Sequence, residues 1–292
     1  MRRREFLRLA GAAALTAGAV SLPVSGLAQP AKKRHIRKAV MYATLGLKGT
    51  LVEQFKAMKA AGFEGVEPMS HMNQAEVLQA LADSGLKAAS VCGSVHWGKP
   101  LSDPDPAVRE EGLAGLKQTL RDAHAYGASS VLLVPGVVNK RATFDECWSR
   151  SILEIHKAVP LAQELGVKIA IEDVWNNFIT TPQQAAAYLD AIGSDQVGWH
   201  FDIGNMIKYS PPETWIPVLG KRILKLHVKE YSKTKGFDVK FFEGDDNWPA
   251  IMKALDDVGY EGWGITEQPS EQTKDVQSLK EFSERLDRVF AS

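Results

Sequence analysis

The sequence predicts a closed barrel of eight strand–helix units, a (β/α)8 barrel, and three observations support this. Short apolar segments rich in β-branched and aromatic residues recur eight times, with amphipathic segments of helical period between them. Strands that alternate with helices form parallel sheets, and eight such units fit a chain of 292 residues. Charged residues end the last four strands, at one edge of the expected barrel. A doubly wound sheet is the alternative, but no glycine-rich nucleotide-binding motif follows the first strand.

The chain begins with a segment that we expect to be a removable leader, residues 1–28. Arginines open it, an uncharged apolar run follows, and Gly26-Leu27-Ala28 offers the small residues that a signal peptidase requires. The apolar run is shorter than the roughly 20 residues that span a bilayer, so we expect no permanent membrane anchor. We expect residues 29–36 to form a short tether and residues 37–292 to form a single barrel domain.

Within the leader, Arg3-Arg4-Glu5-Phe6-Leu7-Arg8 resembles the twin-arginine export signal. The resemblance implies that the protein crosses the membrane already folded, through the twin-arginine translocation machinery. Substrates of this route often carry a cofactor loaded in the cytoplasm, and the destination is the periplasm or another exported location. An ordinary secretory leader rich in arginine is the alternative.

The strand and helix positions follow from the periodicity. We expect strands at 39–42, 65–68, 87–92, 130–134, 168–172, 198–202, 223–228 and 262–267. Amphipathic helices are expected at 51–61, 75–84, 106–126, 144–165 and 276–290. A glycine follows four of these helices at the point where the chain turns back to the next strand, at Gly62, Gly85, Gly127 and Gly166.

Composition excludes several classes of protein. The chain has 35 basic and 35 acidic residues, and the leader holds four of the arginines, so the mature chain is slightly acidic. Nucleic-acid binding normally requires a basic surface, so we expect no nucleic-acid partner. Cys92 and Cys147 could form at most one disulfide. We interpret both as buried thiols, because a protein folded in the reducing cytoplasm has little use for a disulfide.

Four residues end the last four strands: Glu172 in "IAIEDVWN", Asp202 in "WHFDIGN", His227 in "KLHVKEY" and Glu267 in "GITEQ". In a barrel of this type the carboxyl ends of the strands form the catalytic face, so these side chains converge at its mouth. Three carboxylates and an imidazole brought together repel one another unless a cation compensates. A divalent metal is the natural compensation, with Mn²⁺ as first choice and Mg²⁺, Co²⁺, Zn²⁺ or Fe²⁺ as alternatives.

The same residues also have purely structural interpretations. Glu172 and Asp202 could cap helices, His227 could be a core histidine, and Glu267 could pair with Lys229. The common position of all four on one face of the barrel favours the metal site over these alternatives.

With these residues in place, the chain resembles the xylose isomerase-like TIM barrel superfamily of sugar isomerases and epimerases, from about Arg37 to Phe290. The order Glu, Asp, His, Glu matches that family's metal ligands, so the resemblance implies Glu172, Asp202, His227 and Glu267 as ligands. It also implies that Glu172 and Glu267 act as acid and base on either side of the substrate carbon. "FEGVEPM" and "GDDNWPAIMKAL" resemble the family's second-strand and seventh-helix motifs.

Two positions depart from the ketose 3-epimerases of this family. Asn205 stands where those enzymes carry a histidine, and Lys233 stands where they carry an arginine. Asn cannot carry a proton and Lys cannot form the bidentate contact of Arg, so both departures argue against a pure ketose epimerase. We nevertheless expect both side chains to contact the substrate.

Further substrate-binding candidates lie at the ends of other strands. We expect Glu67, His96, Trp175 and Lys229 to contact the substrate, with Trp97 as an additional apolar face. For Glu67 and the two tryptophans, a salt bridge or simple packing is an equally good interpretation. No glycine-rich phosphate cradle follows the last two strands, so a non-phosphorylated sugar or keto-sugar is favoured.

The expected chemistry starts from an enediolate, formed when a carboxylate removes a proton beside a carbonyl. Three reactions can follow from this enediolate: isomerisation, epimerisation and elimination. We favour an isomerase or epimerase. A dehydratase or lyase that eliminates from a keto-sugar, keto-glycoside or inosose is the alternative. An endonuclease IV-like nuclease is less favoured, because it would need more histidines and a DNA-binding face. A non-catalytic carbohydrate-binding barrel is a further alternative. The family resemblance also implies a possible homo-oligomer.

Overall fold

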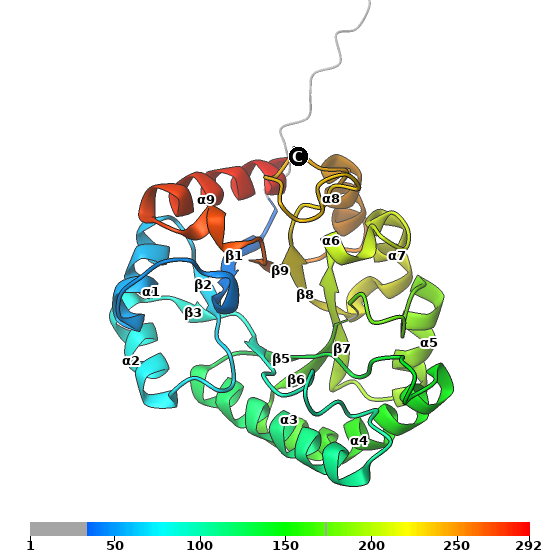
Figure 1. Ribbon diagram of the computed structural model, residues 1–292. Helices are drawn as coiled ribbons and strands as arrows, with labels where there is room; N and C mark the ends of the chain where they lie inside the picture. The colour runs from blue at the N-terminus through cyan, green and yellow to red at the C-terminus, as the bar shows by residue number, and fades with distance from the viewer. Residues whose placement is uncertain (1–33, 173) are drawn as a thin grey trace, which may run out of the picture. The chain divides into compact units, whose positions relative to one another are not determined.

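The computed structural model describes residues 34–172 and 174–292, and in this part of the chain the predicted barrel is confirmed. Parallel strands form an inner ring, and helices surround it, as Figure 1 shows in a view along the barrel. The expected leader, residues 1–28, and the first part of the expected tether lie outside the described residues. Ile36, the last residue of that tether, already belongs to the first strand.

The strands agree closely with the sequence-based expectations. They are β1 (Ile36–Met41), β2 (Gly65–Glu67), β3 (Lys87–Ala88), β4 (Val91–Cys92), β5 (Ser130–Leu133), β6 (Lys168–Ile171), β7 (Val197–Asp202), β8 (Ile223–Val228) and β9 (Gly262–Thr266). All pair in parallel, in the order β3-β2-β1-β9-β8-β7-β6-β5-β4.

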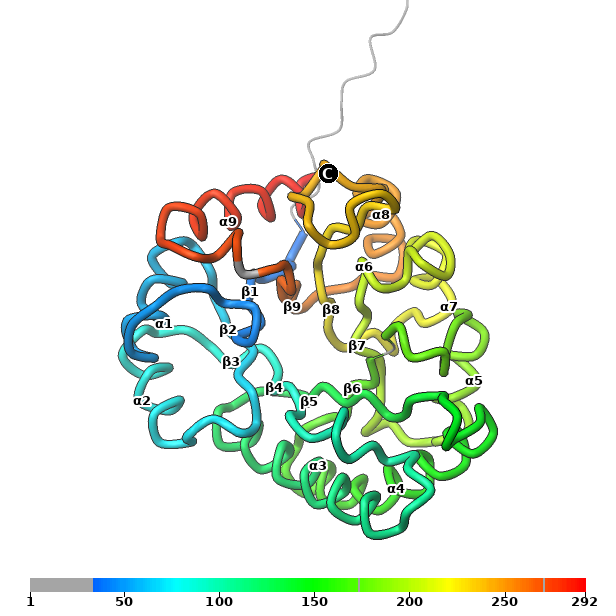
Figure 2. Tube along the Cα trace, in the orientation of Figure 1, coloured from blue at the N-terminus to red at the C-terminus, as the bar shows by residue number. Residues whose placement is uncertain are grey.

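The third strand of the barrel is split, which explains nine strands where eight were expected. β3 pairs with β2 and β4 pairs with β5, so one stretch of chain, 87–92, joins the two edges of the sheet. Figure 2 shows β3 and β4 in succession between β2 and β5. A parallel bridge from Met69 to Cys92 adds a direct contact at this seam. The barrel therefore closes through a broken strand rather than a continuous one.

The helices begin and end where local signals place them. They are α1 (Leu51–Ala60), α2 (Gln74–Ser84), α3 (Pro106–Tyr126), α4 (Phe144–Leu165), α5 (Pro182–Ile192), α6 (Ile203–Met206), α7 (Ile216–Leu219), α8 (Trp248–Asp257) and α9 (Val276–Ala291). Short 3-10 turns lie at η1 (Tyr42–Thr44), η2 (Pro212–Thr214), η3 (Gly220–Arg222) and η4 (Ser270–Thr273). The Thr143 hydroxyl and the Glu146 carboxylate form a capping box that starts α4. Gly127 and Gly166 end α3 and α4 at positive φ, as the sequence predicts.

Two apolar layers hold the barrel together. The larger lies between strands and helices and includes Trp199 and Phe201 of β7. The smaller fills part of the barrel interior, with Met41 of β1 and Leu132 of β5 among its members. Residues 34–172 and 174–292 contain no helix long and apolar enough to span a membrane.

Candidate metal centre and active-site pocket

The structure brings together the four side chains that end the last four strands. Glu172 directly follows β6, Asp202 ends β7, His227 lies one residue before the end of β8, and Glu267 directly follows β9. One potential ligand atom from each lies within 4.8 Å of those of the other three. These residues therefore form one cluster at the carboxyl ends of adjacent strands.

A register shift between β7 and β8 sets the depth of two of these residues. Trp199 lies opposite Ile223, but His200 lies opposite Lys225, so Leu224 is passed over. After the shift, Asp202 lies directly opposite His227. In an unshifted register Asp202 would face Leu226, so the irregularity aligns the carboxylate with the imidazole.

The His227 imidazole is the centre of the cluster. Its Nδ1 lies 2.7 Å from Oε1 of Glu172, 3.5 Å from Oε2 of Glu267 and 3.8 Å from Oδ2 of Asp202. Two ligands that are each about 2.1 Å from one metal ion lie about 3 to 3.5 Å apart. The spacing of these donors is close to that of a single coordination sphere.

Lys229 supplies a positive charge inside the same cluster. Its ammonium group lies 2.7 Å from Oδ2 of Asp202 and also contacts Oε2 of Glu267. Three carboxylates and one ammonium leave two negative charges, which a divalent cation balances when His227 is neutral. Three oxygen donors and one nitrogen donor are also a normal ligand set for such an ion. The residues present therefore fit a divalent metal.

Burial and mutual charge shift the protonation of these groups. Burial, together with the carboxylates of Glu267 and Asp202, raises the pKa of Glu172 to about 8, although His227 counteracts this. Burial would also raise the pKa of Asp202, but the Lys229 ammonium overrides it and holds that pKa at about 2. Burial alone would lower the pKa of His227, whereas its carboxylate neighbours raise it well above the usual value. The cluster is thus an electrostatically coupled unit.

A pocket of about 270 Å³ opens above this cluster. Glu172, Lys229 and Glu267 form its charged side. The remaining lining residues, most of them apolar, are Met41, Cys92, His96, Trp97, Leu132, Val174, Trp175, Asn205 and Phe237. The pocket is therefore charged on one side and largely apolar on the other.

Three of the expected substrate-binding residues line this pocket besides Lys229. The backbone N–H of Val134 donates to Nδ1 of His96, which leaves the imidazole proton on Nε2, and burial lowers the pKa of His96 to about 4. The Trp175 indole N–H donates to the carbonyl of Asn205 at 2.9 Å. The Asn205 amide donates to Oδ2 of Asp202 at 2.7 Å. Asn205 therefore orients a cluster carboxylate from within the pocket wall.

Two other expected substrate-binding residues are not among the pocket-lining residues. Glu67 is fully buried, and its Oε2 contacts Nε2 of His227 at 2.8 Å. Lys233 is exposed in the loop after β8, where its backbone N–H donates to the carboxylate of Asp245.

Apart from Trp97 and Trp175, the apolar pocket residues were not predicted from the sequence. Met41, Cys92 and Leu132 lie at or near the ends of their strands, so the positional rule that found the charged residues also applies to them. These side chains are uncharged, so a search for charged residues at strand ends does not select them. Phe237 comes from the long loop after β8, where periodicity gives no information. Cys92 and Cys147 are free and buried, as expected.

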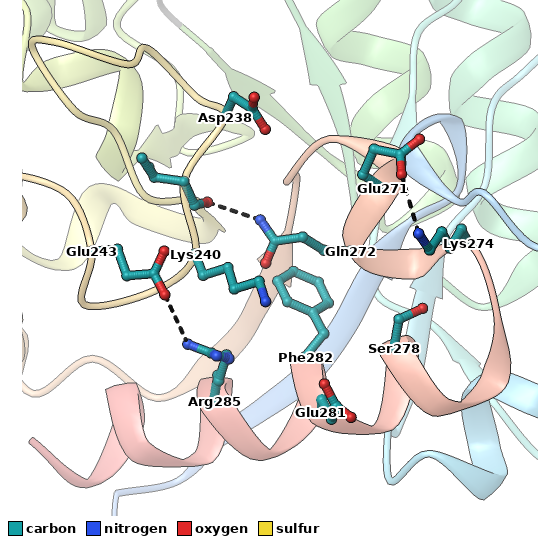
Figure 3. A pocket seen from close by; sticks show the side chains of 11 residues that line it. Asp238, Lys240, Glu243, Glu271, Gln272, Lys274, Ser278, Glu281, Phe282 and Arg285 are labelled. Atoms are coloured by element: carbon teal, nitrogen blue, oxygen red, sulfur yellow. Dashed lines mark hydrogen bonds and ion pairs between the residues drawn. The ribbon is translucent and has the colours of Figure 1, made fainter.

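A second cavity, of about 370 Å³, lies between that loop and α9 (Figure 3). Its charged side chains include the ion pairs Glu243 with Arg285, at 3.7 Å, and Glu271 with Lys274, at 3.5 Å. It contains none of the four cluster residues, so the smaller pocket is the candidate active site.

Comparison with known proteins places this site in a family. Residues 55–288 match the model of the xylose isomerase-like TIM barrel. The chain belongs to this family. The resemblance inferred from the strand-end residues is thereby confirmed.

Relatives by sequence and by structure are sugar epimerases by name. L-ribulose-5-phosphate 3-epimerase UlaE of Salmonella paratyphi A is 24% identical over 234 residues, which cover 75% of this chain and 82% of the relative. D-psicose 3-epimerase, solved in the presence of D-fructose, superposes with a TM-score of 0.74 at 18% identity and covers 88% of this chain and 100% of its own.

A third relative was solved with a metal. The IOLI protein with a bound zinc atom superposes with a TM-score of 0.74 at 16% identity, over 87% of this chain and 98% of that one. At these identities the structural matches establish the fold.

Proposed function

We propose that this protein is a divalent-metal-dependent sugar isomerase or epimerase that acts on a non-phosphorylated sugar or keto-sugar through an enediolate. The observation that carries the proposal is the cluster of three carboxylates and His227 Nδ1, two members of which, Glu172 and Glu267, line a pocket. The sugar epimerases found by sequence and structure support the enzyme class.

The metal would be held by Glu172, Asp202, His227 and Glu267, and Mn²⁺ is the ion we propose, since three donors are carboxylate oxygens. When bound, a divalent ion polarises adjacent carbonyl and hydroxyl oxygens of a sugar and stabilises negative charge that develops on them. Zinc bound to the IOLI protein supports a metal in this fold.

Glu172 and Glu267 are the residues that we assign to proton transfer. They follow β6 and β9, which are separated in the barrel by β7 and β8, and both line the pocket. One carboxylate would remove the proton beside the carbonyl, and the other would return it. The raised pKa of Glu172, about 8, suits a group that exchanges protons near neutral pH.

The pocket chemistry favours a substrate without phosphate. Among the described residues that line the pocket, Lys229 is the only basic one other than His96, and its ammonium is already paired with Asp202 and Glu267. The low pKa of His96 keeps that imidazole neutral at pH 7, so it would not attract a phosphate. This differs from the substrate named for the Salmonella relative and agrees with the free sugar in the psicose epimerase structure.

Elimination from a keto-glycoside is the alternative reaction, and the residues of the pocket wall support this alternative. Trp97, Trp175 and Phe237 offer apolar surface on which a glycosyl group could pack. Asn205 contacts Asp202 instead of offering a second proton donor, which weakens the case for a simple epimerisation.

Export through the twin-arginine route to the periplasm belongs to the same proposal, as does a homo-oligomeric state.

The first experiment measures divalent metal in the purified protein by plasma mass spectrometry, with Asp202→Ala beside the wild type. About one ion per wild-type chain, lost in the variant, supports the site. Proton exchange from the carbon beside the carbonyl of keto-sugars is then followed in D₂O by NMR. A protein that binds metal and sugar but exchanges no proton would be a binding protein, and the enzymatic proposal would be wrong.

A further inference from the structure

A carboxylate contacts the His227 imidazole at each of its two ring nitrogens. Nδ1 lies 2.7 Å from Oε1 of Glu172, on the pocket side, and Nε2 lies 2.8 Å from Oε2 of Glu67. Both His227 and Glu67 are 0% exposed. Nδ1 thus faces the cluster of candidate metal ligands, while Nε2 faces a carboxylate outside that cluster.

Glu67 reaches His227 across the barrel interior. It ends β2, whereas His227 lies on β8, and β1 and β9 separate these strands in the sheet (Figure 1). Glu67 is not among the pocket-lining residues, so a substrate in that pocket would meet Glu172 and Glu267 but not Glu67. Its other oxygen, Oε1, has no hydrogen-bond partner within residues 34–172 and 174–292.

No other side chain in the described part of the chain hydrogen-bonds Nε2 of His227. His200 packs against the ring edge to face, with centroids 4.2 Å apart, but both of its nitrogens lack partners in the same residues. The orientation of the His227 ring therefore depends on Glu67 at Nε2 and on the candidate metal ligands at Nδ1.

An ionised carboxylate can only accept hydrogen bonds. With Glu67 as the acceptor of this contact, the proton lies on Nε2, and a neutral imidazole then presents its lone pair at Nδ1. That lone pair points to the place where the oxygens of Glu172, Asp202 and Glu267 converge. A carboxylate behind the ring also makes Nδ1 a stronger donor.

We propose that Glu67 is a positioning residue that fixes the Nε2–H form of His227 and so prepares Nδ1 to bind the metal. This gives Glu67 a role different from the substrate contact expected from the sequence. The inference rests on the proposed metal site, but it concerns metal affinity and can be tested without any sugar.

The test measures Co²⁺ affinity by calorimetry for the full-length wild type, Glu67→Gln and Glu154→Gln. A glutamine has the size of glutamate, but its amide can donate to Nε2 as well as accept from it, so it no longer selects one tautomer. Glu154 is also a buried carboxylate, paired with Arg109 and Lys157 on the outer helices, and serves as a matched control. We expect Glu67→Gln to weaken Co²⁺ binding about 10- to 100-fold and Glu154→Gln to leave it unchanged.

A second readout observes the imidazole itself. Two-bond ¹H–¹⁵N spectra of the metal-free protein report which ring nitrogen carries the proton of a neutral imidazole, and we expect Nε2–H for His227 in the wild type. The same spectra with diamagnetic Zn²⁺ report which ring nitrogen binds the metal. Loss of that preference in Glu67→Gln supports the inference. Equal Co²⁺ affinity in the wild type and Glu67→Gln, or zinc bound at Nε2, would overturn it while leaving the proposed function intact. A wild type that binds no divalent metal would overturn both.

Discussion

The two halves of the barrel contribute differently to the pocket. Strands β6 to β9 end in the four cluster residues, while β1 and β4 end in, and β5 ends next to, Met41, Cys92 and Leu132. The charged half carries the groups that we propose to bind a metal and to move protons. The apolar half offers no charged group to water, and a less polar surrounding strengthens charge interactions across a pocket. Because different strands carry the charged and the apolar residues, we expect changes in the two halves to affect chemistry and stability separately.

The largest effect is expected in the charged half. Glu172→Gln removes a carboxylate that is both a candidate metal ligand and a candidate proton acceptor. Proton exchange from a keto-sugar should fall about 10²- to 10⁴-fold, as it does when general-base catalysis is lost. Exchange rates in D₂O measured by NMR check this, with Co²⁺ affinity measured beside them. An exchange rate equal to the wild type would show that the charged half is not catalytic.

The matched change in the apolar half should have the opposite outcome. Leu132 is 1% exposed in the barrel interior, and Leu132→Ala leaves a cavity there. The free energy of unfolding should fall by about 2 to 5 kcal/mol. Metal content should stay the same, because Leu132 is no cluster residue. Urea unfolding and plasma mass spectrometry measure the two quantities. Loss of metal in a folded variant would contradict the separation of the halves.

A smaller effect is expected at Gly204, whose backbone lies close to Lys229. A Cβ at Gly204 would lie 2.6 Å from Cγ and 2.8 Å from the carbonyl oxygen of Lys229. Gly204→Ala should therefore cost about 1 to 3 kcal/mol by overpacking and displace the ammonium from Asp202. Thermal unfolding and metal affinity, both with Gly98→Ala as a comparison at an uncrowded glycine outside the left-handed region, check this. Unchanged values for Gly204→Ala would mean that this contact relaxes freely.

The last prediction concerns a carboxylate of the charged half that is not a cluster member, and the size of its effect depends on pH. Burial raises the pKa of Asp246 from 3.8 to about 8, and its Oδ1 has no hydrogen-bond partner in the described ranges. Between these two pH values the folded state holds a proton that the unfolded state releases. Stability from this group is therefore full below pH 3.8 and is lost as the pH rises to about 8.

Asp246→Asn removes this titration and keeps an acceptor for the Tyr231 N–H. The difference in melting temperature between variant and wild type should grow in favour of the variant as pH rises from 5 to 8. Differential scanning fluorimetry at several pH values, with a chelator present, measures it. A constant difference would show that Asp246 is ionised throughout that range.

Much of the fold could be predicted because its signals are local. Glycines such as Gly127 mark helix ends, and helices α3 and α4 have the bounds that periodicity predicts. The split of the third strand near Ser90 could not be predicted, because apolar residues continue through it. Predicting the cluster required only the rule that strand ends converge.

The partners of individual side chains were harder to predict, because they depend on contacts across the barrel. Glu67 and His227 are 160 positions apart in the chain, and no local pattern links them. The pairing of Lys229 with Glu267 was considered from the sequence, but its contact with Asp202 depends on the register of β7 and β8. Local sequence thus specifies where a residue lies on its strand, whereas its neighbours depend on the closed barrel.

The register shift between β7 and β8 also bears on how this site could diversify. Removing one residue from β8 ahead of His227 would turn its side chain toward the helices and take it out of the cluster. The loop after β8 lies outside this strand pairing and brings Phe237 to the pocket. Changes in loop length could therefore reshape the substrate wall during evolution while the residues beneath keep their spacing. A library that varies this loop alone is the natural starting point for altering the substrate preference of this barrel.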